Sequence, residues 1–393
     1  MQGQEGASPT EDARERDSGE RGAEATAPGG RQVWRSSGIS DGAPEGDAGE
    51  RWSAPAARPL EAEQESGLRP QAIQDFVGQR QVVENLRLAL DAARARAEPV
   101  DHVLLSGPPG LGKTTLARLL ASEQGCALHA TSGPALERPK DLIGILSNLA
   151  AGDVLFVDEI HRLPSAVEEY LYTAMEDFTI EFTLNEGAAA RVIPLRLERF
   201  TLVGATTREG LLTAPFRARF GLLERLSPYP VEELEEIAVR AAGRLGLDLQ
   251  RSAARVLSER ARGTPRVVGR YLRRLRDLGE VRGCASLDAP LAEECMQRLG
   301  VDAHGLEHLD REILACLAQH PGRPVGLKTL AAVIGESEDT IEEVYEPHLL
   351  RKGFVHKTSR GRLLTAQGFA ALGLPAPDPT GNADADALPF EPA

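Results

Sequence analysis

The chain has 393 residues, long enough for about two or three domains. No apolar run approaches a membrane span, no signal-peptide pattern opens the chain, and the four cysteines form no C-x-x-C pair, so we expect a cytoplasmic protein with ordinary buried cysteines rather than a disulfide framework or a zinc site. The net charge of −14 argues against nucleic-acid binding only if the acidic residues are spread evenly along the chain.

The acidic residues are not spread evenly, because residues 1–66 hold fourteen acidic and seven basic side chains, half of the net charge. This segment is rich in Gly, Ala, Pro, Glu and Ser and lacks apolar periodicity, so it cannot bury enough surface to offset the entropy of ordering. We expect a disordered acidic tail at 1–66 and a second disordered tail at 375–393. The remaining chain is only mildly acidic, which leaves room for basic surfaces.

The first ordered elements are a helix over residues 81–96 and an apolar strand at 103–105. The strand leads into Gly107-Pro-Pro-Gly-Leu-Gly-Lys-Thr-Thr115, which satisfies the phosphate-loop spacing G-x-x-x-x-G-K-[ST]. Glycines let the backbone N–H groups surround a polyphosphate, Lys113 is expected to reach the β- and γ-phosphates, and the Thr114 hydroxyl is expected to hold Mg²⁺. A glycine-rich turn without a ligand is the alternative, and the strand-loop-helix context disfavours it.

After the phosphate loop, strands and helices alternate: a strand at 127–131, a helix at 141–149 and a strand within 153–159 whose four apolar residues are 154–157. That strand ends in Asp158 and Glu159. A buried parallel strand delivers its last residues to the edge of the sheet where α/β proteins bind ligands. Asp158 is therefore expected to hold the Mg²⁺ hydration shell and Glu159 to polarise the attacking water.

Residues 178–199 alternate with period two around a Gly-containing turn, which predicts a β-hairpin. The hairpin interrupts the α/β alternation and should protrude. Its apolar side chains must pack on the domain or be covered by another protein, and we favour a partner slightly.

A strand at 200–206 ends in the hydroxyls of Thr206 and Thr207, which suit a γ-phosphate or an attacking water. The segment 215–220 then carries Arg217 and Arg219 beside apolar anchors. Either arginine alone could be an ordinary surface charge.

From residue 231 the pattern becomes helical. Pro265 fits the first position of the third helix, which places Arg266 at a helix N-terminus. The expected helices of this second, all-helical domain span 231–245, 252–262, 266–282 and 288–299.

The last unit has helices at 306–320, 327–334 and 338–351 and a hairpin at 353–365, the pattern of a winged helix. The third helix, which usually enters the major groove, carries five acidic residues and should be repelled by phosphate. The hairpin tip carries Lys357, Arg360 and Arg362. We expect this module to hold DNA through the wing without reading sequence.

Taken together, the motifs resemble the RuvB family of AAA+ ATPases, motors that migrate Holliday junctions, over about residues 68–374. The resemblance rests on the phosphate loop and on further motifs: Thr131-Ser-Gly-Pro134, Asp158-Glu-Ile-His-Arg162, Ala174-Met-Glu-Asp-Phe178, Gly204-Ala-Thr-Thr-Arg208, Arg262-Gly-Thr-Pro-Arg266 and Asp339-Thr-Ile-Glu-Glu-Val-Tyr-Glu-Pro347. It implies an α/β P-loop domain at 67–228, with a parallel sheet and helices on both faces, a helical lid at 229–302 and a winged helix at 303–374.

The resemblance also implies roles for single residues. Arg219 would be an arginine finger acting on ATP held by the neighbouring subunit, and Arg266 a sensor of nucleotide state. Lys357, Arg360 and Arg362 would contact duplex DNA. The implied ATP contacts are Leu68, Arg69 and Tyr229 around the adenine, Gly110, Lys113, Thr114 and Thr115 at the phosphates, and Glu176, Asp177 and Phe178 lining the site.

The implied assembly is a homohexameric ring on duplex DNA at four-way junctions, with a RuvA-like partner docking on the 178–199 hairpin and a RuvC-like resolvase as a further partner. Two departures stand out. Ala218 replaces the aspartate usual between the two arginines, so we expect the group that orients the finger to differ. Lys357-Thr-Ser replaces the usual Arg-Thr-Pro, which keeps charge but loses a planar fork.

Two alternatives from other classes stay open. One is another AAA+ machine, such as a clamp loader or a protein remodeller. The other is a nucleotide-gated transcription regulator, against which the acidic third helix counts.

Overall fold

The computed structural model describes residues 70–184 and 191–376, and for residues 182–184 and 191–192 within these ranges it describes the backbone alone. All of these residues belong to one compact unit, residues 56–393. The expected tail at 1–66, most of the tail at 375–393, and the expected adenine contacts Leu68 and Arg69 lie outside the described residues.

In the described part of the chain, the first domain is built on a five-stranded parallel sheet in the order β2-β3-β6-β1-β7. This confirms the predicted α/β class. The edge strand β7 was not predicted, because its alternately exposed residues lack a continuous apolar run. The strands are β1 (Val103–Ser106), β2 (Leu128–Ser132), β3 (Val154–Asp158), β6 (Thr201–Thr206) and β7 (Leu222–Arg225).

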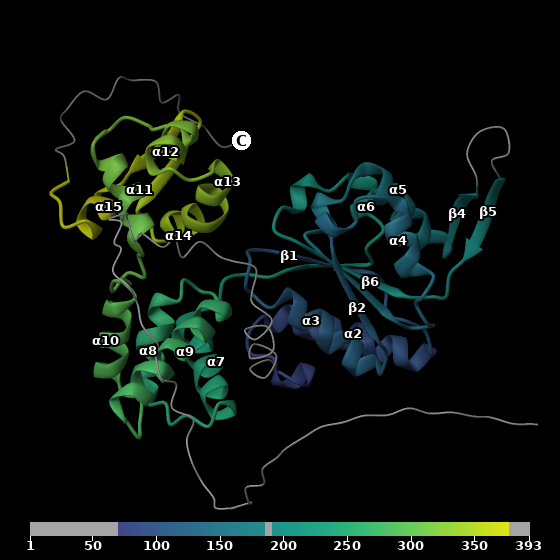
Figure 1. The fold of residues 1–393 in the computed structure, drawn as a ribbon, viewed down its shortest axis with the longest axis horizontal. Coiled ribbons are helices and arrows are strands. Elements are labelled where there is room, and N and C mark those ends of the chain that lie inside the picture. The colour runs from purple at the N-terminus through teal and green to yellow at the C-terminus, as the bar shows by residue number, and fades with distance from the viewer. Residues whose placement is uncertain (1–69, 185–190, 377–393) are drawn as a thin grey trace, which may run out of the picture. The chain divides into compact units, whose positions relative to one another are not determined.

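Helices cover both faces of this sheet, as Figure 1 shows. Alternate strand residues point to opposite faces: Leu105 and Phe156 pack with Leu116 on the side of α2 and α3, whereas Leu104 and Leu155 pack on the side of α4 and α5. The helices are α2 (Arg80–Arg96), α3 (Lys113–Gln124), α4 (Pro139–Leu146), α5 (Ser165–Asp177) and the short α6 (Ala214–Arg217), with 3₁₀ turns at Ile73–Asp75, Gly133–Ala135, Ile160–Arg162 and Glu209–Leu211.

The parallel register brings the chemistry-bearing strand ends to one edge of the sheet. Ser106 at the end of β1 lies opposite Thr206 at the end of β6, and Ser132 lies opposite Asp158. Gly107 follows with φ +134°, and a Cβ there would lie 2.4 Å from the carbonyl oxygen of Leu226. Only glycine therefore lets the phosphate loop begin so close to this neighbouring segment.

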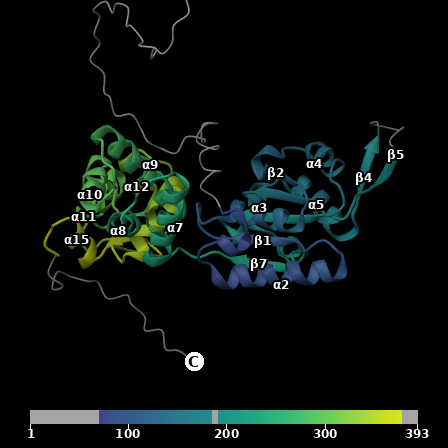
Figure 2. The same cartoon turned by 90° about the horizontal axis from the view of Figure 1, so that it is seen from below.

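The predicted hairpin is present as β4 (Thr179–Leu184) and β5 (Arg191–Arg196), a separate two-stranded antiparallel sheet. Figures 1 and 2 show it extending away from the domain. Its base packs back on the core, where Ile180 is buried and Leu195 lies against the same cluster, whereas Ile193 is 45% exposed. Apolar packing on the domain thus accounts for the base of the hairpin only.

The lid has α7 (Val231–Arg244), α8 (Arg251–Arg260), α9 (Pro265–Arg282) and α10 (Ala289–Arg298). Pro265 occupies the first turn of α9 as predicted, because its missing N–H is not needed there. Tyr271, Leu272 and Leu275 on α9 are buried in a core shared with α7, α8 and α10.

The last domain has the predicted helices and wing, in the form α11 (His308–Ala318), α12 (Leu327–Ile334), α13 (Glu338–Thr340), α14 (Glu346–Arg351), β8 (Val355–Thr358), β9 (Gly361–Leu364) and α15 (Ala366–Ala371). The expected single helix at 338–351 contains a π-turn at Ile341–Tyr345. Pro347 follows this turn and has no N–H to donate, which explains the wider turn. The small helix α15 was not predicted.

None of the described helices is long and apolar enough to cross a membrane. The expectation of buried cysteines is met by Cys295 and Cys316, but it is wrong for Cys284, which is exposed at the end of the lid helix α9.

His348 on α14 makes the stability of the chain depend on pH. Its side chain is buried, its Nε2 lies 3.2 Å from the carbonyl oxygen of His304, and burial lowers its pKa to about 3, assisted by the charge of Arg262. Because the unfolded chain binds this proton near pH 6.5 and the folded chain does not, the stabilisation is complete above pH 6.5 and is lost as the pH falls towards 3.

Urea unfolding at pH 7.5 and 5.5 tests this effect. The His348 contribution to the free energy of unfolding should be about 1.4 kcal/mol smaller at pH 5.5. His348→Gln should remove this part of the pH dependence, whereas the exposed His320→Gln should leave it unchanged. An unchanged pH dependence in His348→Gln would contradict the assignment.

Candidate nucleotide site and DNA-contacting wing

The phosphate loop joins β1 to α3, so the N-terminal end of α3 points its free N–H groups towards the loop. Gly110 and Gly112 have φ of +80° and +105°, conformations open mainly to glycine. The Lys113 ammonium donates to the carbonyl oxygens of Gly107 and Pro108, at 2.7 and 2.9 Å. Lys113 is thereby held along the loop rather than in solvent.

The electrostatics of Lys113 suit a phosphate-binding cation. Burial lowers the pKa of its ammonium, while the nearby carboxylates of Asp158 and Glu159 oppose that shift. An incoming polyphosphate would supply negative charge to this buried ammonium at a place where water is largely excluded.

Most of the predicted site residues line one pocket. They come from the phosphate loop, the end of β3, the hinge before α7 and the start of α9: Gly110, Lys113, Thr114, Thr115, Asp158, Glu159, Tyr229 and Arg266. Sequence reasoning missed other lining residues, namely Pro70, Phe76, Ile237, Arg240, Val268 and Arg273. They supply an apolar wall and extra cationic charge, and no local motif marks them.

Tyr229 and Arg266 bring the lid to the phosphate loop. The buried Tyr229 hydroxyl donates to the carbonyl oxygen of Leu111 at 3.1 Å, and burial raises the pKa of this phenol. The backbone N–H of Arg266 faces the carbonyl oxygen of Gly110 at 3.4 Å. The pocket is therefore closed on one side by residues that belong to the lid.

The acidic pair is held in a strained, hydrogen-bonded arrangement. Glu159 has φ +49°, which is costly for a residue with a side chain, and its N–H donates to Asp158 at 3.0 Å. Gly133 of the Thr131-Ser-Gly-Pro134 motif packs beneath it, because a Cβ there would lie 2.4 Å from the Glu159 carbonyl oxygen. Only glycine therefore lets the 3₁₀ turn after β2 approach the Glu159 backbone so closely.

The Glu159 carboxylate is oriented by two side chains. The hydroxyl of Thr207 donates to its Oε2 at 3.2 Å, and Nδ1 of His161 lies 3.2 Å from the same oxygen. The His161 ring is 7% exposed and also lies 2.9 Å from the hydroxyl of the buried Thr206, and burial lowers its pKa. His161 was not singled out from the sequence, although it stands two residues after Glu159.

Arg219 lies outside this pocket, in contact with α5. Its guanidinium donates to Glu176 at 2.5 Å and to the Tyr172 hydroxyl, and it stacks 4.2 Å from the centre of the Tyr172 ring. Glu176 and Tyr172 thus orient the Arg219 guanidinium, a role that the apolar side chain of Ala218 cannot fill. Tyr172 was missed, yet it precedes Glu176 by one helical turn and shares its face.

The expectation that Glu176, Asp177 and Phe178 line the nucleotide pocket is wrong for the pocket of the same chain, because none of them lines it. All three lie at or just after the C-terminal end of α5. Glu176 pairs with Arg219, and the Phe178 ring packs against Phe200 at 5.9 Å.

The acidic third helix of the winged domain is largely neutralised by its own chain. Lys357 on the wing donates to Glu342 at 2.9 Å, and Arg362 donates to Glu346 at 2.7 Å. Arg208 of the P-loop domain pairs with Asp339 at 3.0 Å and also contacts Glu343. These acidic side chains therefore form ion pairs within the chain.

The three predicted DNA-contacting residues differ in exposure. Arg360 is exposed at the wing tip, Lys357 is half-exposed, and Arg362 is 8% exposed with its guanidinium on the buried Glu346. The expectation that Arg362 is a surface contact needs correction, because in this conformation its charge stabilises the wing.

A phosphate loop, a strand ending in paired carboxylates and a helical lid that closes on the same pocket define a P-loop ATPase of the AAA+ class. Sequence models of three families match the chain in order: a Holliday junction DNA helicase RuvB P-loop domain at 68–226, a RuvB AAA lid domain at 229–302 and a RuvB C-terminal winged helix domain at 303–373. The chain belongs to the RuvB family.

Individual relatives agree with this assignment. The Holliday junction branch migration complex subunit RuvB of Myxococcus xanthus is 52% identical over 326 residues, which cover 82% of this chain and 95% of that protein. The subunit of the same name from Paramagnetospirillum magneticum is 53% identical over 82% of this chain and 93% of its own length. A solved Thermotoga maritima RuvB Holliday junction branch migration motor is 45% identical, with a TM-score of 0.72 over 79% of this chain and 100% of its own.

Proposed function

We propose that this protein is an ATP-driven DNA motor that moves duplex arms through a four-way junction. The observation that carries the proposal is the succession of RuvB P-loop, lid and winged-helix domains along one chain, with a pocket lined by the phosphate loop between the first two. Hydrolysis at this pocket supplies the work, and the winged helix supplies contact with DNA.

In this proposal ATP binds with its phosphates against the loop. Lys113 and the N-terminal end of α3 bind the phosphates, while Thr114 and Thr115 add hydroxyls. The apolar wall around Phe76 suits the base. Leu68, Arg69 and Tyr229 are the expected contacts of the adenine.

Mg²⁺ fits the donors that line the pocket. The Thr114 hydroxyl and the Asp158 carboxylate are oxygen ligands, which Mg²⁺ prefers, and it is commonly held by one or two protein side chains together with phosphate and water. No cluster of three or more acidic, histidine or cysteine side chains suited to a metal occurs among the described residues, which fits an ion brought by the nucleotide. The bound ion supplies positive charge for the leaving phosphate groups.

Water attacks the γ-phosphate in line, with Glu159 orienting it. Thr207 and His161 fix the carboxylate of Glu159, so one oxygen stays directed while the other accepts from water. His161 acts as a positioning residue, because it touches Glu159 and Thr206 and does not line the pocket.

Arg219 acts on ATP bound by the neighbouring subunit of a homohexameric ring. Two features support a role in trans. Arg219 does not line the pocket of its own chain, and it pairs on α5 with Glu176, an expected nucleotide contact that does not line that pocket either. The expected nucleotide contacts of Glu176, Asp177 and Phe178 are then made to the neighbour's ATP. A complete active site requires two subunits.

Duplex DNA contacts the basic wing through phosphate, with Arg360 as the most accessible contact. Arg360→Gln should weaken binding to any duplex by about the same factor and lower the slope of log K against log salt by about 1. Fluorescence anisotropy over a salt series measures both. Arg282→Gln, on the exposed end of α9, is the matched control and should leave the slope unchanged.

A RuvA-like junction-binding protein is the proposed partner of the β4–β5 hairpin, since Ile193 stays exposed beyond the packed base. A RuvC-like resolvase and a cytoplasmic location remain further predictions from the sequence.

Branch migration of a synthetic four-way junction, with and without the RuvA-like partner, tests the function. The proposal predicts ATP-dependent migration that the partner increases. A clamp loader or protein remodeller would instead show ATPase activity without migration. A transcription regulator would protect one preferred duplex site in a footprint, which the internally paired acidic helix disfavours.

A further inference from the structure

The segment 262–266 lies between the phosphate loop and the winged helix. On the side of the phosphate loop, the N–H of Arg266 faces the carbonyl oxygen of Gly110, and a Cβ on Gly110 would lie 2.7 Å from the methyl group of Thr264. The segment is therefore in direct contact with the loop that is expected to hold the nucleotide phosphates.

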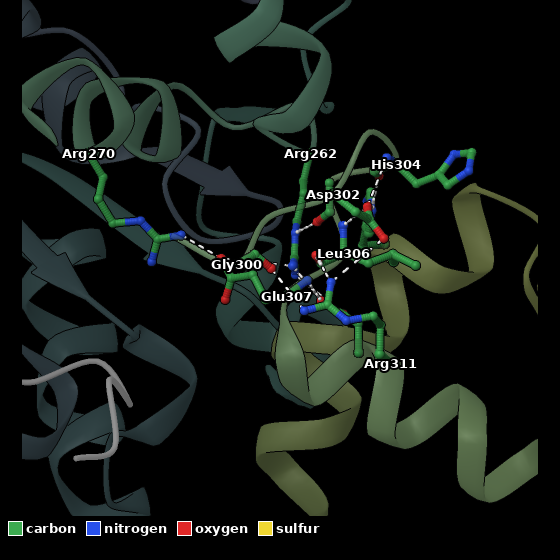
Figure 3. A network of polar contacts seen from close by, with 11 residues as sticks. Arg262, Arg270, Gly300, Asp302, His304, Leu306, Glu307 and Arg311 are labelled. Carbon is green, nitrogen blue, oxygen red and sulfur yellow. Dashed lines mark hydrogen bonds and ion pairs between the residues drawn. The ribbon is translucent and has the colours of Figure 1, made fainter. Parts of the chain in front are cut away.

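On its other side the same segment is fastened to the winged helix. Arg262 donates from Nη2 to Asp310 at 2.5 Å and from Nε to the carbonyl oxygen of Gly305 at 2.9 Å. Arg351 donates to the carbonyl oxygen of Arg262 at 2.9 Å. Figure 3 shows Arg262 surrounded by the residues that lead from the lid into α11.

The ion pair between Arg262 and Asp310 is almost completely shielded from water. Asp310 is fully buried, and the Arg262 side chain is 10% exposed. Asp310 also accepts from the N–H of Glu307 at 2.7 Å, which fixes the start of α11. A buried pair of this kind holds its partners in one relative position, because opening it leaves a charge without water or a counter-ion.

The backbone of the segment is held as firmly as its side chains. Arg262 has φ +58°, a conformation that a residue with a side chain adopts only when its surroundings impose it. A Cβ on Gly263 would lie 2.8 Å from Pro228, and the N–H of Tyr229 donates to the Gly263 carbonyl oxygen at 2.9 Å. Tyr229 in turn reaches the phosphate loop at Leu111, so the hinge before the lid and the segment contact the same loop.

A second contact comes from Arg270, eight residues after Arg262 and within α9. Arg270 donates to Glu307 at 2.6 Å, and Glu307 also lies 3.9 Å from Arg262. Arg262 and Arg270, both labelled in Figure 3, thus approach the start of α11 from two places on the lid.

We propose that Arg262 is a positioning residue that couples the nucleotide site to DNA movement. It does so by holding the winged helix against the segment 262–266, which contacts the phosphate loop. The winged helix then moves with the lid as one body during each ATP cycle. This inference rests on the proposed motor function.

The test measures base pairs migrated per ATP hydrolysed, using the full chain, a synthetic four-way junction and the RuvA-like partner. Arg262→Gln should keep ATP binding and hydrolysis near the wild-type values, while the migration per ATP falls by about tenfold, the size expected for a lost coupling contact. Asp310→Asn should give the same defect. The double variant should be no worse than either single variant, because both remove one shared interaction.

Arg260→Gln is the matched control. Arg260 has the same side-chain exposure of 10%, but its partners belong to the lid: it pairs with Glu293 at 2.7 Å and donates from Nε to the carbonyl oxygen of Asp302, the last lid residue, at 3.0 Å. It should lower thermal stability as much as Arg262→Gln does and still migrate junctions with the wild-type yield per ATP. Arg262→Lys, which keeps charge and loses the planar fork, should restore part of the yield.

Three results would overturn the inference. The first is a wild-type yield per ATP in Arg262→Gln, and the second is an equal loss of yield in Arg260→Gln. The third is a loss of ATP binding in Arg262→Gln, which would place the residue in the nucleotide site itself. If the wild-type protein hydrolyses ATP but does not migrate junctions, the proposed function fails instead, and that outcome is recognised before any variant is compared.

Discussion

Lys113→Ala should abolish ATP turnover, with a fall of at least about 10³-fold, because the phosphates lose their one buried ammonium at the point where negative charge develops. Lys113 lies along the phosphate loop and faces Asp158 and Glu159. Without it the two carboxylates repel the γ-phosphate, so affinity for ATP should fall together with turnover.

A coupled ATPase assay and a fluorescent-nucleotide titration measure both effects. Lys140→Ala, on the exposed surface of α4, is the control and should hydrolyse ATP at the wild-type rate. Substantial turnover by Lys113→Ala in a protein with unchanged thermal stability would show that the phosphate loop is not the catalytic site.

Arg219→Ala should bind ATP with near wild-type affinity and hydrolyse it about 10³- to 10⁵-fold more slowly, the range known for a missing arginine finger. Binding is retained because Arg219 does not line the pocket of its own chain. Its side chain instead contacts Tyr172 and Glu176 on α5.

Mixing the two inactive variants tests whether the finger acts in trans. In a mixed ring, a subunit carrying Arg219→Ala supplies Lys113, and a neighbour carrying Lys113→Ala supplies Arg219. Random assembly of equal amounts then makes roughly one site in four complete, so ATPase activity should return although neither variant is active alone.

Absence of recovery in assembled mixed rings would mean that both residues act within one subunit. Arg217 provides a second check, since it stands two residues before Arg219 and contacts Glu209 at 3.7 Å. If Arg217→Ala rather than Arg219→Ala removed turnover, the finger would have to be reassigned.

Local patterns were sufficient for much of the site. The phosphate loop, the run ending in Asp158 and the strand ending in Thr207 could all be predicted, because each joins an element to its chemistry within a few residues. The parallel sheet then brings these ends to one edge, a consequence of strand direction alone. Pro265 likewise fixed the start of α9 through its own geometry.

The errors and omissions concern partners far apart in sequence. Periodicity places Tyr172 and Glu176 on one helix face but does not say that Arg219, more than forty residues later, will cover it. The wing arginines could not be separated by exposure, because only packing shows that Arg362 turns inwards to Glu346. The π-turn before Pro347 was foreseeable from the missing N–H, but it was not predicted.

By itself, the sequence determined that this chain binds and cleaves a nucleoside triphosphate, which three domains it has and which family it resembles, since these depend on short motifs and on apolar periodicity. The tertiary structure decided how Arg219 is held, which wing residue faces solvent and how Arg262 joins the lid to the winged helix. The reason is physical: a charged side chain selects its partner by burial and distance after folding, and neither quantity is encoded in the local pattern.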